Sequence, residues 1–177
     1  MENRSQVRNW KEFHLNESIS NKPTPFAIFA INYFPNNASV VDMGCGNKRD
    51  TNYFRKHGFM VNPVDPYSNK EGVIKIKSLD YDITEDVVYS RFFLHSVSDA
   101  VIVDLINRTP NLFAAECRAI GDKPKIYHHE RNFVDPQWIV NTLRLCDFRL
   151  KYIELNKGLA KYKDEDPLVL RIIAQRK

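Results

Sequence analysis

The sequence predicts an α/β fold with a mostly parallel, seven-stranded sheet and helices on both of its faces. Short apolar segments rich in β-branched residues alternate with segments of helical periodicity along most of the chain. No repeat, low-complexity stretch or linker rich in proline, glycine and serine interrupts this alternation. The 177 residues are enough for one hydrophobic core. We therefore expect a single domain over residues 1–177, in which residues 1–35 form a helical segment that leads into the sheet.

Capping and turn residues set the bounds of the expected elements. Thr24 and Pro25 are typical of the cap and first turn of a helix, and the apolar run after them continues to Phe34. Further helices are expected at 49–58 (ended by Gly58), 98–107 (capped by Ser98) and 136–148 (capped by Asp135). The expected strands lie at 38–43, 59–65, 72–78, 86–93, 111–120, 148–155 and 167–175.

The composition is that of an ordinary globular protein, with 43% hydrophobic and 27% charged residues. The formal net charge of +4 leans basic, but the lysines and arginines are scattered, which favours a solvated surface over a nucleic-acid partner. Cys45, Cys117 and Cys146 form no C-x-x-C pair, so neither a disulfide framework nor a zinc site is indicated. The sequence shows no signal-peptide core, and its apolar stretch at 25–34 is too short to cross a bilayer. We expect a soluble, cytoplasmic protein.

The stretch VVDMGCGNKRD, residues 40–50, places two glycines in the first strand-to-helix turn. In parallel α/β sheets, ligands bind at the carboxyl ends of the strands. Gly44 and Gly46 permit positive φ there and let a ligand approach the backbone closely, while the following helix presents free N–H groups. Asp65 ends the next strand, where an acid can accept hydrogen bonds from ribose hydroxyls. These features predict a pocket for a cofactor that contains adenosine.

Two classes of cofactor compete for this pocket. A dinucleotide fingerprint requires G-x-G-x-x-G, but Arg49 stands at the third glycine position. Asp42, just before the glycines, would also place a negative charge near the pyrophosphate. The same acid suits a ligand with an ammonium and a sulfonium group, and S-adenosylmethionine has both.

The segment VVDMGCGNKRDTNYF resembles the first motif of class I S-adenosylmethionine-dependent methyltransferases, and VNPVDPYS resembles the second. VVYSRFFLHSV is similar to the fourth motif, where a strand ends under the transferring methyl group. The resemblance implies a Rossmann-like fold, S-adenosylmethionine as the cofactor and S-adenosylhomocysteine as the product. It also implies that Gly44 and Gly46 pass beneath the methionine moiety and that Asp65 holds the ribose.

The cofactor-binding residues that this resemblance implies are Asp42, Gly44, Cys45, Gly46, Asp65, Pro66, Ser90 and Arg91, with Asp80 or Asp82 near the adenine. Lys48 departs from the family pattern, which usually has a glycine at this position.

Later segments resemble a narrower group of proteins. HHERNFVDPQW and IELNKGLAKYKDEDPLVLRIIAQRK are similar to small methyltransferases of polysaccharide and glycan biosynthesis, including a domain of a chlorella-virus capsid-glycan enzyme. This resemblance implies a sugar hydroxyl as the acceptor. Methyl transfer is an in-line displacement, so the enzyme aligns oxygen, methyl carbon and sulfur and needs a base for the hydroxyl proton. The candidate bases are His95 and His129, with Glu116 as a carboxylate alternative.

Charged side chains could hold the vicinal hydroxyls of a sugar by paired hydrogen bonds. The candidates are Arg91, Arg118, Arg131, Glu165 and Asp166. Structural roles compete with these: His95 could be a core residue, Glu116 and Arg118 could pair on one face of a strand, and residues 164–166 could be an acidic turn. No ligand spacing indicates a metal site, although some sugar methyltransferases use a divalent ion to bind the acceptor diol.

The sequence predicts an S-adenosylmethionine-dependent O-methyltransferase that acts on a sugar hydroxyl at the end of a glycan or polysaccharide chain, in an open acceptor site. Two alternatives stay open. The acceptor could be RNA, which a continuous basic groove beside the cofactor pocket would favour, or a small metabolite. Lys48 instead motivates a non-catalytic protein that binds the cofactor weakly and serves as a scaffold.

Overall fold

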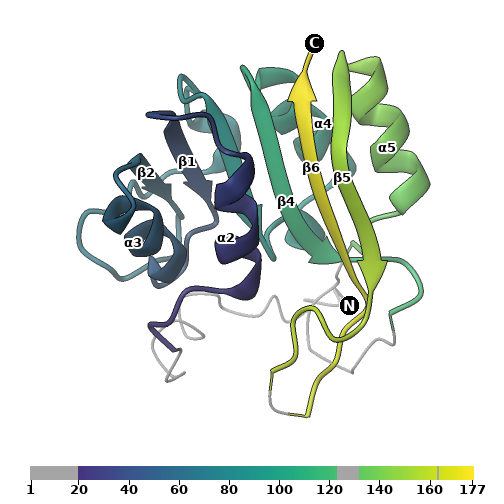
Figure 1. The fold of residues 1–177 in the computed structure, drawn as a ribbon, viewed down its shortest axis with the longest axis horizontal. Helices are drawn as coiled ribbons and strands as arrows, with labels where there is room; N and C mark the ends of the chain where they lie inside the picture. Colours follow the sequence, from purple (N-terminus) through teal and green to yellow (C-terminus); the bar gives the residue numbers. More distant parts are fainter. Residues whose placement is uncertain (1–19, 123–131, 163) are drawn as a thin grey trace, which may run out of the picture.

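The computed structural model describes residues 20–122, 132–162 and 164–177, which build one mixed β-sheet with helices packed against it (Figure 1). Within these residues the sheet has six strands, in the order β2-β1-β3-β4-β6-β5. The strands are β1 (Ser39–Met43), β2 (Met60–Val64), β3 (Val87–Arg91), β4 (Leu112–Arg118), β5 (Phe148–Asn156) and β6 (Val169–Arg176). Neighbours from β2 to β4 are parallel, whereas β6 is antiparallel to both β4 and β5. The carboxyl ends of the first four strands therefore meet at one edge of the sheet.

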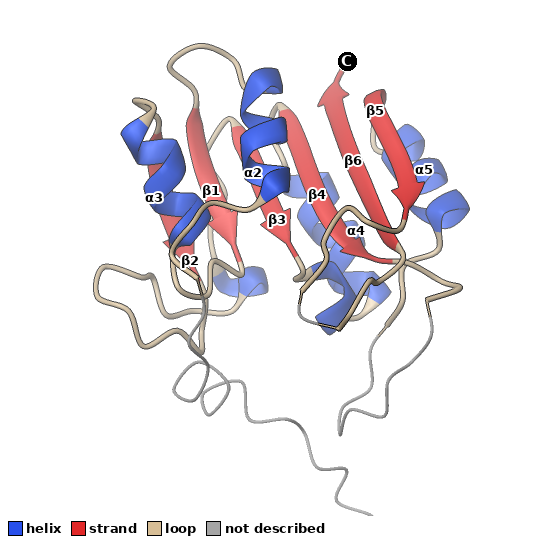
Figure 2. Ribbon diagram, turned by 60° about the horizontal axis from the view of Figure 1, so that its bottom comes forward, coloured by secondary structure: helices blue, strands red, loops and turns tan. Residues whose placement is uncertain are grey.

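Helices cover the sheet in two layers. Figures 1 and 2 show α2 (Pro25–Ala30) and α3 (Arg49–Lys56) on one face, and α4 (Asp99–Arg108) and α5 (Pro136–Leu145) on the other. Short 3-10 turns follow α2 (η1, Ile31–Tyr33), precede β3 (η2, Ser78–Asp80) and follow β3 (η3, Leu94–Ser96). No helix in the described part of the chain is long and apolar enough to cross a membrane.

The sheet divides the hydrophobic core into two clusters. Val41 of β1 packs in one cluster with Ile102 of α4, whereas its neighbour Val40 packs in the other with Phe26 of α2 and Phe54 of α3. Adjacent side chains of a strand point to opposite faces, so β1 is buried on both sides. This double burial explains why β1, β3 and β4 read as almost continuous apolar runs instead of alternating ones.

Two of the expected helix caps form side-chain hydrogen bonds. Thr24 Oγ1 accepts from a backbone N–H of the first turn of α2 at 3.1 Å, and Asp135 Oδ1 accepts from the first turn of α5 at 2.8 Å. Ser98 occupies the N-cap position of α4, but its side chain makes no capping hydrogen bond. The Thr24 hydroxyl also donates to Asp50 of α3 at 2.9 Å, so this cap joins two helices.

The expected strand at 72–78 is wrong, and the described sheet has six strands in place of seven. In this segment Ile74 makes a single bridge, with Val64. The N–H of Ile74 donates to the carbonyl of Pro63 at 2.9 Å, so Pro63 faces the outer edge of β2. Because proline has no N–H, this edge lacks a hydrogen-bond donor at Pro63. Arg55 Nη2 occupies another acceptor of this edge, the carbonyl of Val61, at 2.6 Å. The segment 72–78 therefore forms only one bridge to β2 and does not become a strand.

Candidate functional site

A tight glycine loop joins β1 to α3 at the carboxyl edge of the sheet. Gly44 and Gly46 have φ of 77° and 53°, a region that glycine enters without strain. The N–H groups of Gly44 and Cys45 donate to the carbonyl of Val64 at 2.8 and 3.3 Å, which ties the loop to the end of β2. A Cβ on Gly44 would lie 2.9 Å from side-chain atoms of Phe93. Both backbone conformation and the close approach of Phe93 therefore require glycine at this position.

Asp65 supports the glycine loop from the end of β2. Its carboxylate accepts from the backbone N–H groups of Gly46, Tyr67 and Ser68 at 3.0, 2.8 and 3.1 Å. The Ser68 hydroxyl returns a hydrogen bond to the carbonyl of Gly46 at 2.7 Å. A carboxylate offers about four lone-pair sites, so a ribose at this position would have to share Asp65 with these donors or displace one.

Asp42 is a buried acid beneath the loop. Its side chain accepts a hydrogen bond from the Thr51 hydroxyl at 2.5 Å. Burial, with the nearby charges of Asp50 and Asp65, raises the pKa of Asp42 from its ordinary value to about 7. Burial and the charge of Asp42 likewise raise the pKa of the Cys45 thiol. A positively charged ligand beside the loop would relieve this accumulation of negative charge.

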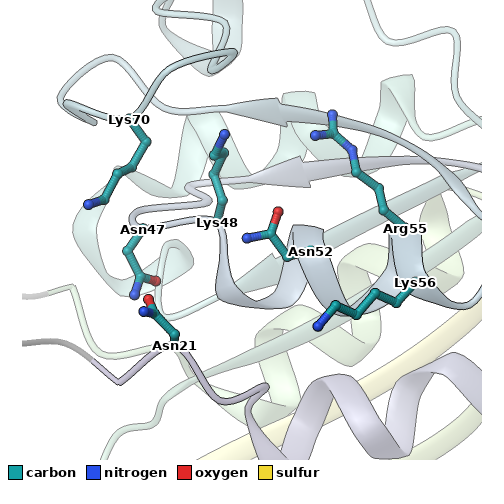
Figure 3. A pocket seen from close by; sticks show the side chains of 7 residues that line it. All are labelled: Asn21, Asn47, Lys48, Asn52, Arg55, Lys56 and Lys70. Carbon is teal, nitrogen blue, oxygen red and sulfur yellow. The ribbon is translucent and has the colours of Figure 1, made fainter.

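Lys48 occupies the last position of the loop in a left-handed conformation, with φ of 64°. This backbone geometry explains why glycine suits the position. The Lys48 ammonium reaches across to donate to the carbonyl of Glu71, so the side chain bridges the loop and the segment after β2. The Lys48 side chain also lines a groove beside α3 (Figure 3).

This groove is basic and has a volume of about 680 Å³. Figure 3 shows its walls, which are formed by Asn21, Asn47, Lys48, Asn52, Arg55, Lys56 and Lys70. None of these described lining residues is acidic. Asn52 and Lys56 are four residues apart, which places them along one side of α3, and Lys48 lies at the N-cap of the same helix. The groove therefore presents four cationic side chains and three amides next to the glycine loop.

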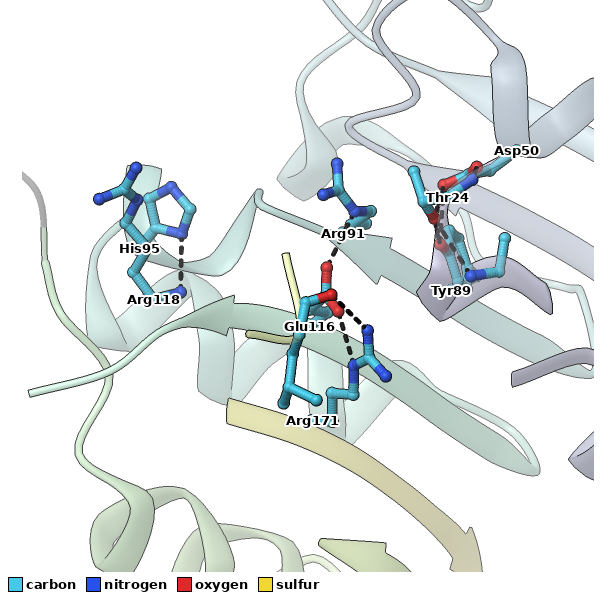
Figure 4. Close-up of polar contacts among 10 residues, drawn as sticks. Thr24, Asp50, Tyr89, Arg91, His95, Glu116, Arg118 and Arg171 are labelled. Atoms are coloured by element: carbon cyan, nitrogen blue, oxygen red, sulfur yellow. Dashed lines mark hydrogen bonds and ion pairs between the residues drawn. The ribbon is translucent and has the colours of Figure 1, made fainter. Parts of the chain in front are cut away.

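A network of charged side chains lies where β3, β4 and β6 meet (Figure 4). Glu116 of β4 is buried and accepts from Arg91 Nε at 2.9 Å and from Arg171 Nε at 2.7 Å. Each of its oxygens therefore has a guanidinium partner. Glu116 and Arg118 do not pair with each other, because Arg171 lies directly opposite Glu116 on β6.

His95 and Arg118 belong to a second, adjacent cluster. The backbone N–H of Arg118 donates to Nδ1 of the buried His95 at 3.2 Å, which leaves the proton of a neutral ring on Nε2 (Figure 4). The Arg118 guanidinium binds Asp122 at 3.0 Å and Glu165 at 2.5 Å. Arg118 therefore anchors the segment before β6 to the end of β4.

The acidic residues of that segment hold the chain in place. Asp166 Oδ1 accepts from the N–H of Gly158 at 2.6 Å, and its other oxygen lies 3.9 Å from Lys161 Nζ. Together with the contact between Glu165 and Arg118, these bonds hold residues 157–162 and 164–166 beside the charged network.

The other predicted site residues differ in burial, and some lie outside the described part of the chain. Asp80 and Asp82 are both exposed, at and just after η2. Ser90 Oγ is buried at the end of β3 without a hydrogen-bond partner among the described residues. Pro66 directly follows Asp65. His129 and Arg131 lie outside the described residues. Within the described ranges, no three side chains of His, Cys, Asp or Glu gather as a metal site.

Three residues of this edge were missed by the sequence reasoning. Phe93 packs on Gly44, Arg171 binds Glu116, and Arg49 begins α3 beside the network. The sequence did contain a sign of the role of Arg171, because a lone arginine within the apolar run VLRIIA requires a buried partner of opposite charge. No sequence signal pointed to Phe93 or Arg49, since the surroundings of both side chains depend on how distant segments meet.

No protein-family model and no curated protein matches the sequence. Solved structures, however, share its fold. The 1,6-didemethyltoxoflavin-N1-methyltransferase of Burkholderia thailandensis, with bound 1,6-didemethyltoxoflavin and S-adenosylhomocysteine, superposes with a TM-score of 0.70 at 19% identity, covering 86% of this chain and 77% of that chain. A methyltransferase of Methanosarcina mazei has a TM-score of 0.66 at 16% identity, covering 84% and 96%.

A third structure is the magnesium protoporphyrin IX methyltransferase of Synechocystis PCC 6803 with bound S-adenosylmethionine. Its TM-score is 0.64 at 14% identity, covering 86% of this chain and 76% of that chain. The chain thus has the fold of S-adenosylmethionine-dependent methyltransferases.

Proposed function

We propose that this protein is a methyltransferase that binds S-adenosylmethionine over the glycine loop. The observation that carries the proposal is the loop itself: two glycines of positive φ between β1 and α3, held by Asp65 of β2, in a fold shared with methyltransferases crystallised with this cofactor or its product. Such loops at the carboxyl edge of a parallel sheet are ligand sites.

The charges around the loop fit this cofactor. The ligand carries an ammonium and a sulfonium group, and Asp42 and Asp65 bring acidic side chains to the ends of β1 and β2. Asp42 and the glycine loop would hold the methionine part, and Asp65 the ribose, with Asp80 or Asp82 toward the adenine. When bound, S-adenosylmethionine supplies a methyl group on sulfur that an acceptor oxygen can attack.

We further propose a sugar hydroxyl of a glycan as the acceptor. The resemblance of the late segments supports this choice, as do the charged side chains beyond β3, which can bind vicinal hydroxyls. Of the candidate bases, His95 uses Nδ1 as an acceptor and Glu116 is neutralised by two guanidinium groups. Both are poorly suited to accept a proton, so we assign the base to His129, with Arg118, Arg131, Glu165 and Asp166 around the acceptor.

The basic groove of Figure 3 favours a second acceptor, RNA. Lys56 and Lys70 are exposed and Asn47 belongs to the glycine loop, so a phosphate backbone in the groove would run next to the cofactor. None of the described residues that line the groove is aromatic, which argues against base stacking on them.

The first experiment is calorimetric binding of S-adenosylhomocysteine, with NAD as the competing ligand class. We expect micromolar binding of the former alone, weakened at least tenfold, or about 1.4 kcal/mol, by Asp65→Asn. Asp104→Asn, at a half-buried acid of α4 that pairs with Arg108, is the matched control and should bind as the wild type does. If S-adenosylhomocysteine does not bind, the cofactor proposal is wrong and the scaffold alternative gains.

Methyl transfer to glycosides and to short RNA then distinguishes the acceptors. Transfer to RNA that weakens with Lys56→Gln and Lys70→Gln, and no transfer to glycosides, would replace the sugar proposal with the RNA one. Cofactor binding without transfer to either acceptor would favour the scaffold.

A further inference from the structure

The charged network at the end of β3 contains more cations than anions. Glu116 has 1% of its surface exposed, and its two oxygens are taken by Arg91 and Arg171. One carboxylate can balance only one of these guanidinium charges. Removing a charge from water without a partner is costly, so a partly buried excess charge calls for an anion.

Arg49 adds a third guanidinium to this region. It is the first residue of α3, directly after the glycine loop, and it is partly buried. Within the described part of the chain its guanidinium forms no hydrogen bond or ion pair. Burial and then the charge of Arg91 lower the pKa of Arg49, while Asp50 and Glu116 oppose this effect.

Neither acid satisfies Arg49. Glu116 is used by Arg91 and Arg171, and Asp50 accepts from Thr24 N–H at 2.8 Å and from the Tyr89 hydroxyl at 2.8 Å. The region therefore holds three guanidinium groups but only two carboxylates, and both carboxylates already accept hydrogen bonds from other groups.

The Arg91 side chain is held in a fixed orientation. Its guanidinium stacks on the ring of Phe92 at 4.3 Å, and its Nε faces Glu116. Phe92 has φ of 55°, a left-handed conformation that is unfavourable for a residue with a Cβ. The two terminal NH₂ groups of Arg91 have no hydrogen bond to described residues, and 16% of the side chain is exposed. These groups form a fork suited to a planar or tetrahedral anion.

We propose that Arg49 and Arg91 form a binding site for an anionic group, a carboxylate or a phosphate, of a ligand held at the carboxyl edge of the sheet. Arg49 directly follows the glycine loop and Arg91 ends β3, the strand that pairs with β1, so the site lies beside the loop. The proposal rests on the proposed function for the identity of that ligand. The anion is either the carboxylate of the cofactor's methionine part or an acidic group of the acceptor.

Anion binding can be measured without any cofactor. We expect inorganic phosphate, compared with chloride at equal ionic strength, to raise the thermal midpoint of the wild type, and Arg49→Gln to lose most of that rise. Arg49→Lys keeps the charge and should retain part of it. Arg149→Gln, an exposed arginine of β5, should respond to phosphate as the wild type does. An equal phosphate effect in Arg49→Gln, Arg91→Gln and the wild type would overturn the proposal.

A pair of cofactor analogues identifies the source of the anion. S-adenosylhomocysteine and its decarboxylated analogue differ only in the carboxylate. If Arg49→Gln weakens binding of the first at least tenfold and of the second not at all, the cofactor supplies the anion. If both bind Arg49→Gln as they bind the wild type while the phosphate effect is lost, the acceptor supplies it. Failure of S-adenosylhomocysteine to bind the wild type would count against the proposed function. It would leave the anion site untouched, because the phosphate experiment uses no cofactor.

Discussion

Lys48 shows how a single backbone angle can be tested apart from its side chain. Its φ of 64° costs a residue with a Cβ about 1–2 kcal/mol relative to glycine. We expect Lys48→Gly to be more stable than Lys48→Ala by about 1 kcal/mol, because both lose the contact with Glu71 but only glycine removes the strain. Urea unfolding measures the difference.

The same pair of substitutions at Asn52, inside α3, is the control and should give the opposite sign. Glycine in a helix interior is about 1 kcal/mol less stable than alanine. Equal stabilities of the glycine and alanine variants at position 48 would contradict the assignment of backbone strain to Lys48.

At the level of residues, the sequence predicts positions better than partners. The spacing of Gly44, Gly46 and Asp65 was sufficient to expect one loop, and the structure brings them together. The partner of Glu116 could not be predicted, because Arg171 reaches it from a strand 55 residues away. Hydrogen-bond partners of this kind follow from strand register, which a single sequence does not contain.

At the level of elements, the N-cap of α2 ties two helices to the sheet. The Thr24 hydroxyl caps α2 and donates to Asp50, which also accepts from Tyr89 of β3. We expect Thr24→Ala to cost about 2–4 kcal/mol, the sum of a lost cap and a lost buried hydrogen bond to a carboxylate. Thr24→Ser keeps both bonds and should recover most of the loss in a urea titration.

Ser98→Ala is the matched control, since Ser98 has the same N-cap position on α4 but no capping hydrogen bond. Its cost should stay within about 0.5 kcal/mol, as for ordinary surface substitutions. Similar costs at the two caps would show that the link between Thr24 and Asp50 contributes nothing.

Helix ends that depend on neighbouring residues were predicted correctly, whereas the strand expected at 72–78, which depends on a distant partner strand, was not. The caps at Thr24 and Asp135 and the helix end near Gly58 depend on neighbouring residues and agree with the structure. The strand expected at 72–78 has a suitable pattern, yet it needs an edge to pair with, and Pro63 and Arg55 remove that edge. Pro63 itself was visible in the sequence as a sign of an edge strand.

At the level of the whole molecule, sheet order brings opposite charges to neighbouring positions. Alternation along the sequence predicted the parallel part of the sheet, but not that β6 would insert antiparallel between β4 and β5. That insertion delivers Arg171 to Glu116 and leaves the carboxyl edge with acids beneath the glycine loop and guanidiniums beside it. A ligand with both cationic and anionic groups would complement this edge.

Asp42 links that edge to the pH dependence of global stability. Its pKa is raised to about 7 in the folded protein, against about 3.9 in an unfolded chain. The folded state therefore binds more protons between these values, so the stabilising contribution is complete below about pH 4 and is lost as pH rises through 7. We expect the free energy of unfolding to fall between pH 5 and 8 by roughly 2.5 kcal/mol more in the wild type than in Asp42→Asn, which cannot ionise.

S-adenosylmethionine should reverse this trend. A cationic ligand beside Asp42 favours the ionised carboxylate, so binding releases a proton near neutral pH, and stabilisation by the ligand should grow from pH 6 to pH 8 in the wild type. In Asp42→Asn the same ligand excess should stabilise by an amount that does not change with pH. Urea unfolding with and without ligand at three pH values gives all of these quantities. If the free energy of unfolding depends on pH in the same way in both proteins, with and without ligand, Asp42 stays ionised in the folded state and the ligand's charge does not interact with it.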